Sequence, residues 1–195
     1  MSDYSSPEPV FDEPEPNSRG TSAFRILLEV VQTLALAVVL YFLIDFVVAR
    51  VRVENISMLP TLQPGEFVLV NKMAYKIGDF HRGYIVVFHY SPQEDYIKRV
   101  IGVPGDIIEV DSEQVRVNGQ VLNEPYISAA PSYEGVWEVP VDSLFVLGDN
   151  RNQSSDSHRW GVISEQSVVG EALVVYWPLS EAKLLSQPLT VQANN

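Results

Sequence analysis

Residues 26–49 read ILLEVVQTLALAVVLYFLIDFVVA, an apolar run of 24 residues that decides the first feature of the fold. As an α-helix at about 1.5 Å per residue, the run covers roughly 36 Å, enough to cross a hydrocarbon core of about 30 Å. Its polar residues Glu29, Gln32 and Asp45 lie toward the ends, where side chains reach the lipid headgroups. A cleaved signal peptide has a shorter apolar region, of about 7–15 residues. The run therefore predicts an uncleaved membrane anchor helix over 23–49.

The segment before the anchor differs sharply in composition. Residues 1–22 hold four prolines and five acidic residues. Such a stretch buries too little apolar surface to offset the entropy lost on ordering, so a disordered acidic tail is expected. Two arginines precede the apolar run (Arg19 and Arg25) and two follow it (Arg50 and Arg52), so the charge rule does not orient the anchor.

After the anchor the apolar residues alternate with a period of two, which is typical of β-strands. Asn118-Gly119 lies between two such runs and is the strongest short-range signal for a β-hairpin. The expected strands cover 51–56, 67–70, 84–88, 96–101, 107–110, 115–122, 144–147 and 172–176. We therefore predict an all-β domain over 50–180, built as a coiled β-sheet or barrel. A small β-hairpin insertion is expected over 110–143 and a C-terminal tail over 181–195.

Composition excludes several classes of function. The 195 residues carry 25 acidic and 13 basic side chains, a formal net charge of −12, which argues against a nucleic-acid-binding protein. With no cysteine, the chain has no thiolate nucleophile and no cysteine-type metal site. Its three histidines have no metal-binding spacing, so no metal or cofactor is expected.

Three polar segments could carry chemistry, although each has an ordinary structural explanation. Ser57 follows a predicted strand and precedes Pro60, so a turn could present its hydroxyl beside free backbone N–H groups. Lys98 stands in an apolar strand, where desolvation would lower its pKa and make it a usable base, unless it extends its amine to water. Residues 148–161 concentrate hydrogen-bonding groups, as in an orienting network or a solvated connector.

Other nucleophile schemes fit less well. The chain has no Gly-x-Ser-x-Gly elbow. A Ser-His-Asp triad could use His158 with Asp149 or Asp156, but nothing in the sequence fixes that geometry. Ser180 and Lys183 match a Ser-x-x-Lys pattern in the tail without its companion motifs, so we interpret this match as coincidence.

In this order, the three segments resemble the motifs of the bacterial type I signal peptidases, membrane-anchored Ser-Lys endopeptidases that remove signal peptides from exported proteins. The resemblance covers about residues 28–179. It rests on SMLPTL (57–62), RGYIVVF (82–88), YIKRVIGVPGD (96–106) and GDNRNQSSDSHRWG (148–161).

The resemblance implies a role for each matching residue. Ser57 is the expected nucleophile and Lys98 the expected general base, with the Ser57 N–H and the Asn55 side chain receiving the oxyanion. Ser154 is expected to hydrogen-bond the Lys98 ammonium. The expected supporting residues are Asp149, Asp156 and Arg99, and the expected substrate-binding residues are Glu54, Ile56, Asp95, Tyr96 and Ile97.

The chain departs from the family pattern at three positions. Tyr84 replaces a usual Asp, a change expected to be structural. Asn55 stands where relatives often have Ser or Gly. His158 replaces an Arg, and neutral His makes no permanent salt bridge with Asp156.

The resemblance also implies partners and a location. Preproteins with signal peptides are the expected substrates, the lipid bilayer is an expected partner, and the secretion translocon is expected nearby. The expected location is the plasma membrane, crossed once, with a cytoplasmic N-terminus. Two other functions stay open on the residues alone: a membrane-tethered β-domain that binds peptides without cutting them, and a Ser-Lys self-cleaving regulator.

Overall fold

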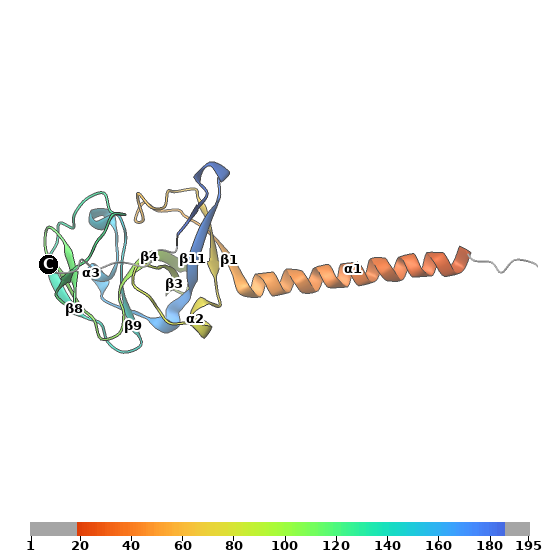
Figure 1. Ribbon diagram of the computed structural model, residues 1–195, viewed down its shortest axis with the longest axis horizontal. Helices are drawn as coiled ribbons and strands as arrows, with labels where there is room; N and C mark the ends of the chain where they lie inside the picture. Colours follow the sequence, from red (N-terminus) through yellow and green to blue (C-terminus); the bar gives the residue numbers. More distant parts are fainter. Residues whose placement is uncertain (1–18, 186–195) are drawn as a thin grey trace, which may run out of the picture. The chain divides into compact units, whose positions relative to one another are not determined.

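The computed structural model describes residues 19–185, and these form one long helix followed by a domain made mostly of β-strands (Figure 1). The chain divides into two units after Leu43. Helix α1 (Arg19–Val47) contains an apolar stretch of 25 residues, Ala23–Val47, whose length and composition fit a single membrane span.

The helix ends two residues before the predicted anchor does. Val48 and Ala49 belong to strand β1, where they pair with Asn71 and Val70 of strand β2. The pairing satisfies their backbone groups in a sheet rather than in a helix. The strand predicted over 51–56 is therefore placed too late, because β1 ends at Arg52 and the chain bends after it.

The larger sheet runs in the order β1-β2-β11-β3-β4-β9-β10, with β12 paired to β11 and every pair antiparallel. In the described part of the chain, β1 and β10 are its unpaired ends, so the sheet is open and the predicted alternative of a closed barrel is wrong. Its strands are β1 (Val48–Arg52), β2 (Phe67–Asn71), β3 (Ile85–Ser91), β4 (Glu94–Gly102), β9 (Ser143–Leu147), β10 (Ile163–Ser164), β11 (Val168–Trp177) and β12 (Lys183–Leu184).

A smaller sheet of four strands has the order β7-β6-β5-β8. Asn118 and Gly119 join β6 to β7 with positive φ angles of 54° and 78°, the backbone geometry that a two-residue hairpin turn requires. The segment 110–143 thus supplies three strands to this sheet, and β5 supplies the fourth. The strands are β5 (Ile107–Val110), β6 (Val115–Val117), β7 (Gln120–Val121) and β8 (Gly135–Glu138).

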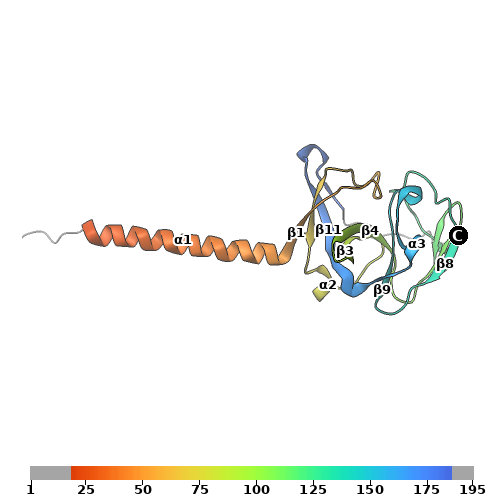
Figure 2. The same cartoon turned by 180° about the vertical axis from the view of Figure 1, so that it is seen from behind.

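Helices after α1 are short. Figure 2 shows α3 beside β9, and the Ser157 hydroxyl of α3 accepts a hydrogen bond of 3.0 Å from the Val146 N–H of β9. The short helices are α2 (Ala74–Ile77), α3 (Ser157–Trp160), η1 (Arg151–Gln153), η2 (Glu165–Ser167) and η3 (Leu179–Glu181).

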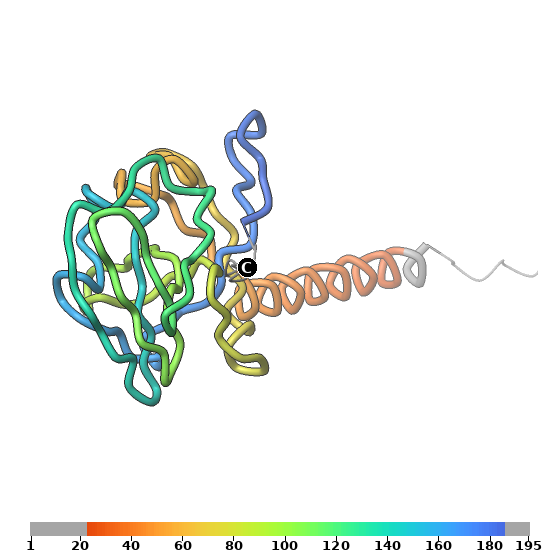
Figure 3. The backbone as a smooth tube through the Cα atoms, turned by 60° about the vertical axis from the view of Figure 1, so that its left-hand side comes forward, coloured from red at the N-terminus to blue at the C-terminus, as the bar shows by residue number. Residues whose placement is uncertain are grey.

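The predicted tails lie mostly outside the described residues. Of the acidic tail expected over 1–22, only 19–22 are described, and they begin α1. Of the tail expected over 181–195, residues 181–185 are described. Lys183–Leu184 form β12, which returns along β11 as a hairpin, seen in blue in Figure 3.

Candidate active site

Ser57 lies in the turn after β1, and buried neighbours hold this turn against the core. Met58 and Leu62 are fully buried beside Val53. The Leu62 N–H donates to the Met58 carbonyl at 2.8 Å, which closes the turn. Ser57 itself is 9% exposed, so most of the residue is shielded from bulk water.

Lys98 lies on β4 with its amine directed at this hydroxyl. Its Nζ donates to Ser57 Oγ at 2.8 Å and to the Ile97 carbonyl at 3.1 Å. The Lys98 residue is 4% exposed, and desolvation by this burial lowers its pKa from 10.5 to about 8, although Asp156 and Asp149 act in the opposite direction. At neutral pH a larger fraction of the molecules therefore carries Lys98 as a neutral amine than an ordinary lysine pKa would give.

A cleft of about 320 Å³ opens over these two side chains. One wall comes from residues 51–57 and a second from residues 95–98 of β4. Val87, Gln153 and Ser155 complete the lining. Asn55 lines this cleft. The five predicted substrate-binding residues line it too, namely Glu54, Ile56, Asp95, Tyr96 and Ile97.

Among residues 19–185, no strand pairs with one edge of the first half of β4, beside the cleft. Residues 94–98 pair with β3 on one side, whereas β9 pairs with β4 only from Arg99 onward. Unpaired backbone groups on such an edge can receive another extended chain.

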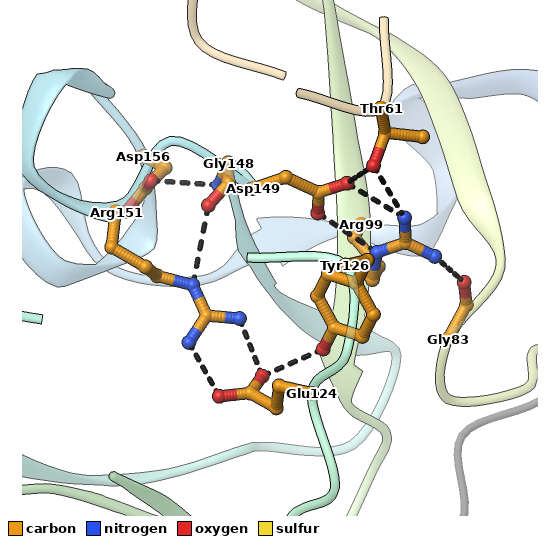
Figure 4. Close-up of polar contacts among 9 residues, drawn as sticks. All are labelled: Thr61, Gly83, Arg99, Glu124, Tyr126, Gly148, Asp149, Arg151 and Asp156. Atoms are coloured by element: carbon orange, nitrogen blue, oxygen red, sulfur yellow. Dashed lines mark hydrogen bonds and ion pairs between the residues drawn. The ribbon is translucent and has the colours of Figure 1, made fainter. Parts of the chain in front are cut away.

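Arg99 follows Lys98 and points to the other face of β4, into a buried ion pair (Figure 4). Its guanidinium donates to both carboxylate oxygens of Asp149, at 2.8 and 2.7 Å, and to the Gly83 carbonyl at 2.7 Å. Asp149 also accepts a hydrogen bond from Thr61 Oγ1. Because Thr61 belongs to the Ser57 turn, this network ties the turn, β4 and the 148–161 loop together.

Asp156 organises the 148–161 loop from within. It accepts the Gly148 N–H at 2.8 Å, and its carboxylate caps the N-terminus of α3. His158 Nδ1 lies 2.6 Å from Asp156 Oδ1, so His158 contacts Asp156 by a hydrogen bond. His158 also stacks on Tyr133, with ring centroids 3.9 Å apart.

Ser154 differs from its predicted role. Its side chain is buried near Ser57, but in the described residues its Oγ has no hydrogen-bond partner. In the described residues the predicted bond to the Lys98 amine is therefore not formed, and Lys98 Nζ donates to Ser57 Oγ and to the Ile97 carbonyl. Space here is tight: a Cβ at position 148 would collide with Ser154 Oγ and the Ser57 carbonyl, so only glycine fits.

Sequence reasoning missed a second buried ion pair behind the loop (Figure 4). Arg151 is fully buried and donates to both carboxylate oxygens of Glu124, at 2.7 and 2.5 Å, and its Nε donates to the Gly148 carbonyl at 3.2 Å. The Tyr126 hydroxyl donates to Glu124 at 2.6 Å, and its ring covers the Arg99 guanidinium at 3.9 Å. In the sequence, the only signal for this pair was an acidic residue, Glu124, two positions before an aromatic one, Tyr126. That pattern is too common to predict a buried ion pair.

A family model described as "Signal peptidase, peptidase S26" matches residues 27–177. The chain belongs to this signal peptidase family. Its members are serine peptidases, so the chain is a hydrolase of that class, and the predicted family resemblance is confirmed.

Curated proteins named as signal peptidases are similar to this chain over most of its length. "Signal peptidase I" of Leptolyngbya laminosa is 40% identical over 96% of this chain and 98% of the relative. "Probable signal peptidase I-2" of Synechocystis is 42% identical over 82% of this chain and 77% of the relative. "Signal peptidase IB" of Staphylococcus aureus is 37% identical over 83% of this chain and 95% of the relative. A crystal structure of a signal peptidase I from Enterococcus faecalis is 30% identical, covers 49% of this chain and 97% of that one, and aligns with a TM-score of 0.44.

Proposed function

We propose that this signal peptidase is a membrane-bound endopeptidase that cuts N-terminal signal peptides from exported preproteins after Ala-x-Ala sites. Ser57 is the nucleophile and Lys98 the general base. The observation that carries the proposal is the 2.8 Å contact between Lys98 Nζ and Ser57 Oγ inside a cleft, with burial lowering the pKa of Lys98 to about 8.

The reaction proceeds in two stages. Neutral Lys98 takes the proton from the Ser57 hydroxyl, and the oxygen attacks the scissile carbonyl carbon. The Ser57 N–H and the Asn55 amide stabilise the oxyanion, and the Lys98 ammonium then gives its proton to the leaving amine. This leaves an ester between Ser57 and the signal peptide. Lys98 next takes a proton from water, whose oxygen attacks the ester carbonyl. The Lys98 ammonium then returns that proton to the departing Ser57 oxygen, which releases the signal peptide and restores the free enzyme.

The substrate binds as an added strand. An extended signal peptide pairs with the free edge of β4 at residues 95–97 and lies against residues 54–56 on the opposite wall. Ile56 and Ile97 line shallow apolar pockets that take the two small residues of the Ala-x-Ala site. Arg99, Asp149 and Asp156 hold the elements that carry these walls.

Helix α1 anchors the enzyme in the plasma membrane near the secretion translocon. Preproteins present their cleavage sites after translocation, so the peptidase domain over 50–180 lies outside the cytoplasm and residues 1–22 lie inside. The apolar stretch Ala23–Val47 has the length that one crossing of the bilayer requires.

The test is incubation of the detergent-solubilised protein with a preprotein whose signal ends in Ala-x-Ala. Wild-type enzyme should release the mature protein, and Ser57→Ala should release none while keeping the wild-type thermal unfolding midpoint. Ser180→Ala is the matched control, because Ser180 stands in the other Ser-Lys pattern and outside the cleft, and it should cleave normally. Substantial cleavage by folded Ser57→Ala enzyme would refute the assignment.

A further inference from the structure

Two lysines lie beside the last turn of α1, and neither takes part in the proposed cleavage reaction. Lys72 Nζ donates to the Asp45 carbonyl at 2.8 Å, and Lys76 Nζ lies 5.2 Å from the centroid of the Phe46 ring. Within residues 19–185 neither lysine forms a salt bridge, although the chain carries a net charge of −12. By contrast, Lys183 pairs with Glu66. Both ammonium groups thus keep donors available for an external anion.

The same two lysines line a cleft of about 450 Å³. Tyr75 and Phe80 stack in its wall with ring centroids 4.0 Å apart. The Tyr75 hydroxyl is buried and has no hydrogen-bond partner in the described residues. Burial raises the pKa of Tyr75, so this hydroxyl keeps its proton and stays a donor. The remaining lining residues are Glu165, Gln166, Val168 and Val169.

These groups favour an anion with several acceptor oxygens. The buried Tyr75 hydroxyl has lost its hydrogen bonds to water, and an acceptor in the cleft would restore one of them. The lining carries two lysines against the carboxylate of Glu165, and Glu171 lies close enough to raise the pKa of Tyr75. The site therefore suits a phosphate ester with one negative charge better than a multiply charged anion.

We propose that this cleft binds the phosphodiester of an anionic membrane-lipid headgroup, held by Lys72 and Lys76 where α1 meets the peptidase domain. The inference rests on the proposed membrane span. Ala23–Val47 fits the bilayer in length, so residue 47 lies at the headgroup level, and the Lys72 N–H donates to the Val47 carbonyl at 2.9 Å. Position therefore favours a lipid phosphate over a free one, although the recognition chemistry of the two is shared.

The test exploits the fact that the chain has only four lysines, Lys72, Lys76, Lys98 and Lys183. Full-length protein in uncharged detergent is dimethylated with ¹³C, which keeps each lysine charge, and the NMR signals are assigned from Lys→Arg variants. Titration with dihexanoyl phosphatidylglycerol should shift the Lys72 and Lys76 signals saturably and leave Lys183 unmoved. Lys72→Gln should weaken the response of Lys76 about tenfold, whereas Lys183→Gln should not change it.

A parallel titration with inorganic phosphate separates the two sources of the anion. The proposal expects little shift at the same concentration, and equal shifts of Lys72 and Lys76 would make this a free-phosphate site and overturn the lipid assignment. Absence of any shift with the lipid, or an equal shift at Lys183, would overturn the site altogether. The readout involves no peptide cleavage, so its failure is distinct from failure of the proposed peptidase activity.

Discussion

Lys98 Nζ lies 2.8 Å from Ser57 Oγ, although 41 positions separate the two residues in the chain. Two elements bring them together: the Ser57 turn, held in the core by Met58 and Leu62, and strand β4. The buried pair of Arg99 and Asp149 locks the same two elements from the other face of β4. The contact therefore depends on how the Ser57 turn packs against β4 and the core.

The pH profile of cleavage should report the ionisation of Lys98. Burial lowers its pKa to about 8, and only the neutral amine accepts a proton. We expect kcat/KM to be high above about pH 8 and to fall about tenfold for each pH unit below about pH 7. Measurement of initial rates on a preprotein between pH 5 and 10 checks this expectation.

Arginine should not replace this lysine, because guanidinium keeps its proton in proteins. Lys98→Arg should therefore be as inactive as Lys98→Ala, whereas Lys183→Arg, in the second Ser-Lys pattern, should cleave normally. Near-normal turnover by Lys98→Arg would mean that another group supplies the base, and the Ser-Lys assignment would have to be abandoned.

Removal of the Ser154 hydroxyl should separate stability from activity. The hydroxyl is buried without a partner, so Ser154→Ala should unfold at the same temperature as wild type or higher. If Ser154 accepts a hydrogen bond from the ammonium formed on Lys98 during the reaction, kcat should fall about tenfold with little change in KM. Steady-state kinetics beside thermal unfolding test both parts, with Ser180→Ala as control. Full activity would exclude this role.

Loss of the charge on Glu124 should destabilise the enzyme strongly. Glu124→Gln leaves the fully buried Arg151 guanidinium without its carboxylate, a change that typically costs about 3–5 kcal/mol. Glu134→Gln removes an exposed carboxylate from the same insertion and should cost less than about 1 kcal/mol. Denaturant unfolding of the two variants gives the comparison. Equal stability would show that Arg151 does not need this partner.

Membrane topology can be tested with introduced cysteines, because the natural chain has none. A cysteine at Ser112, which is exposed in the peptidase domain, should react with a membrane-impermeant maleimide added to intact cells. A cysteine at Ser5 should react only after the cells are opened. Labelling of position 5 from outside would reverse the proposed orientation.

Local patterns in the sequence were sufficient for much of the fold. The length of the apolar run predicted α1, because crossing a bilayer depends on length and hydropathy alone. Period-two alternation predicted a mostly β domain, and Asn118-Gly119 predicted the β6–β7 hairpin, because its turn needs residues that tolerate positive φ. The order of the motifs around Ser57 and Lys98 pointed to the family that the comparisons confirm.

Tertiary structure decided what depends on partners distant in the chain. Helix α1 ends at Val47 because Val48 pairs with Asn71, a residue that no pattern near the anchor reveals. The larger sheet stays open because its two end strands, β1 and β10, do not pair with each other in the described residues. Glu124 pairs with Arg151, 27 positions away in the chain. Ser154 Oγ has no hydrogen-bond partner in the described residues, whereas Lys98 Nζ donates to Ser57 Oγ. Sequence patterns report local periodicity and turn preference, whereas pairing and the direction of a buried side chain depend on contacts that exist only after folding.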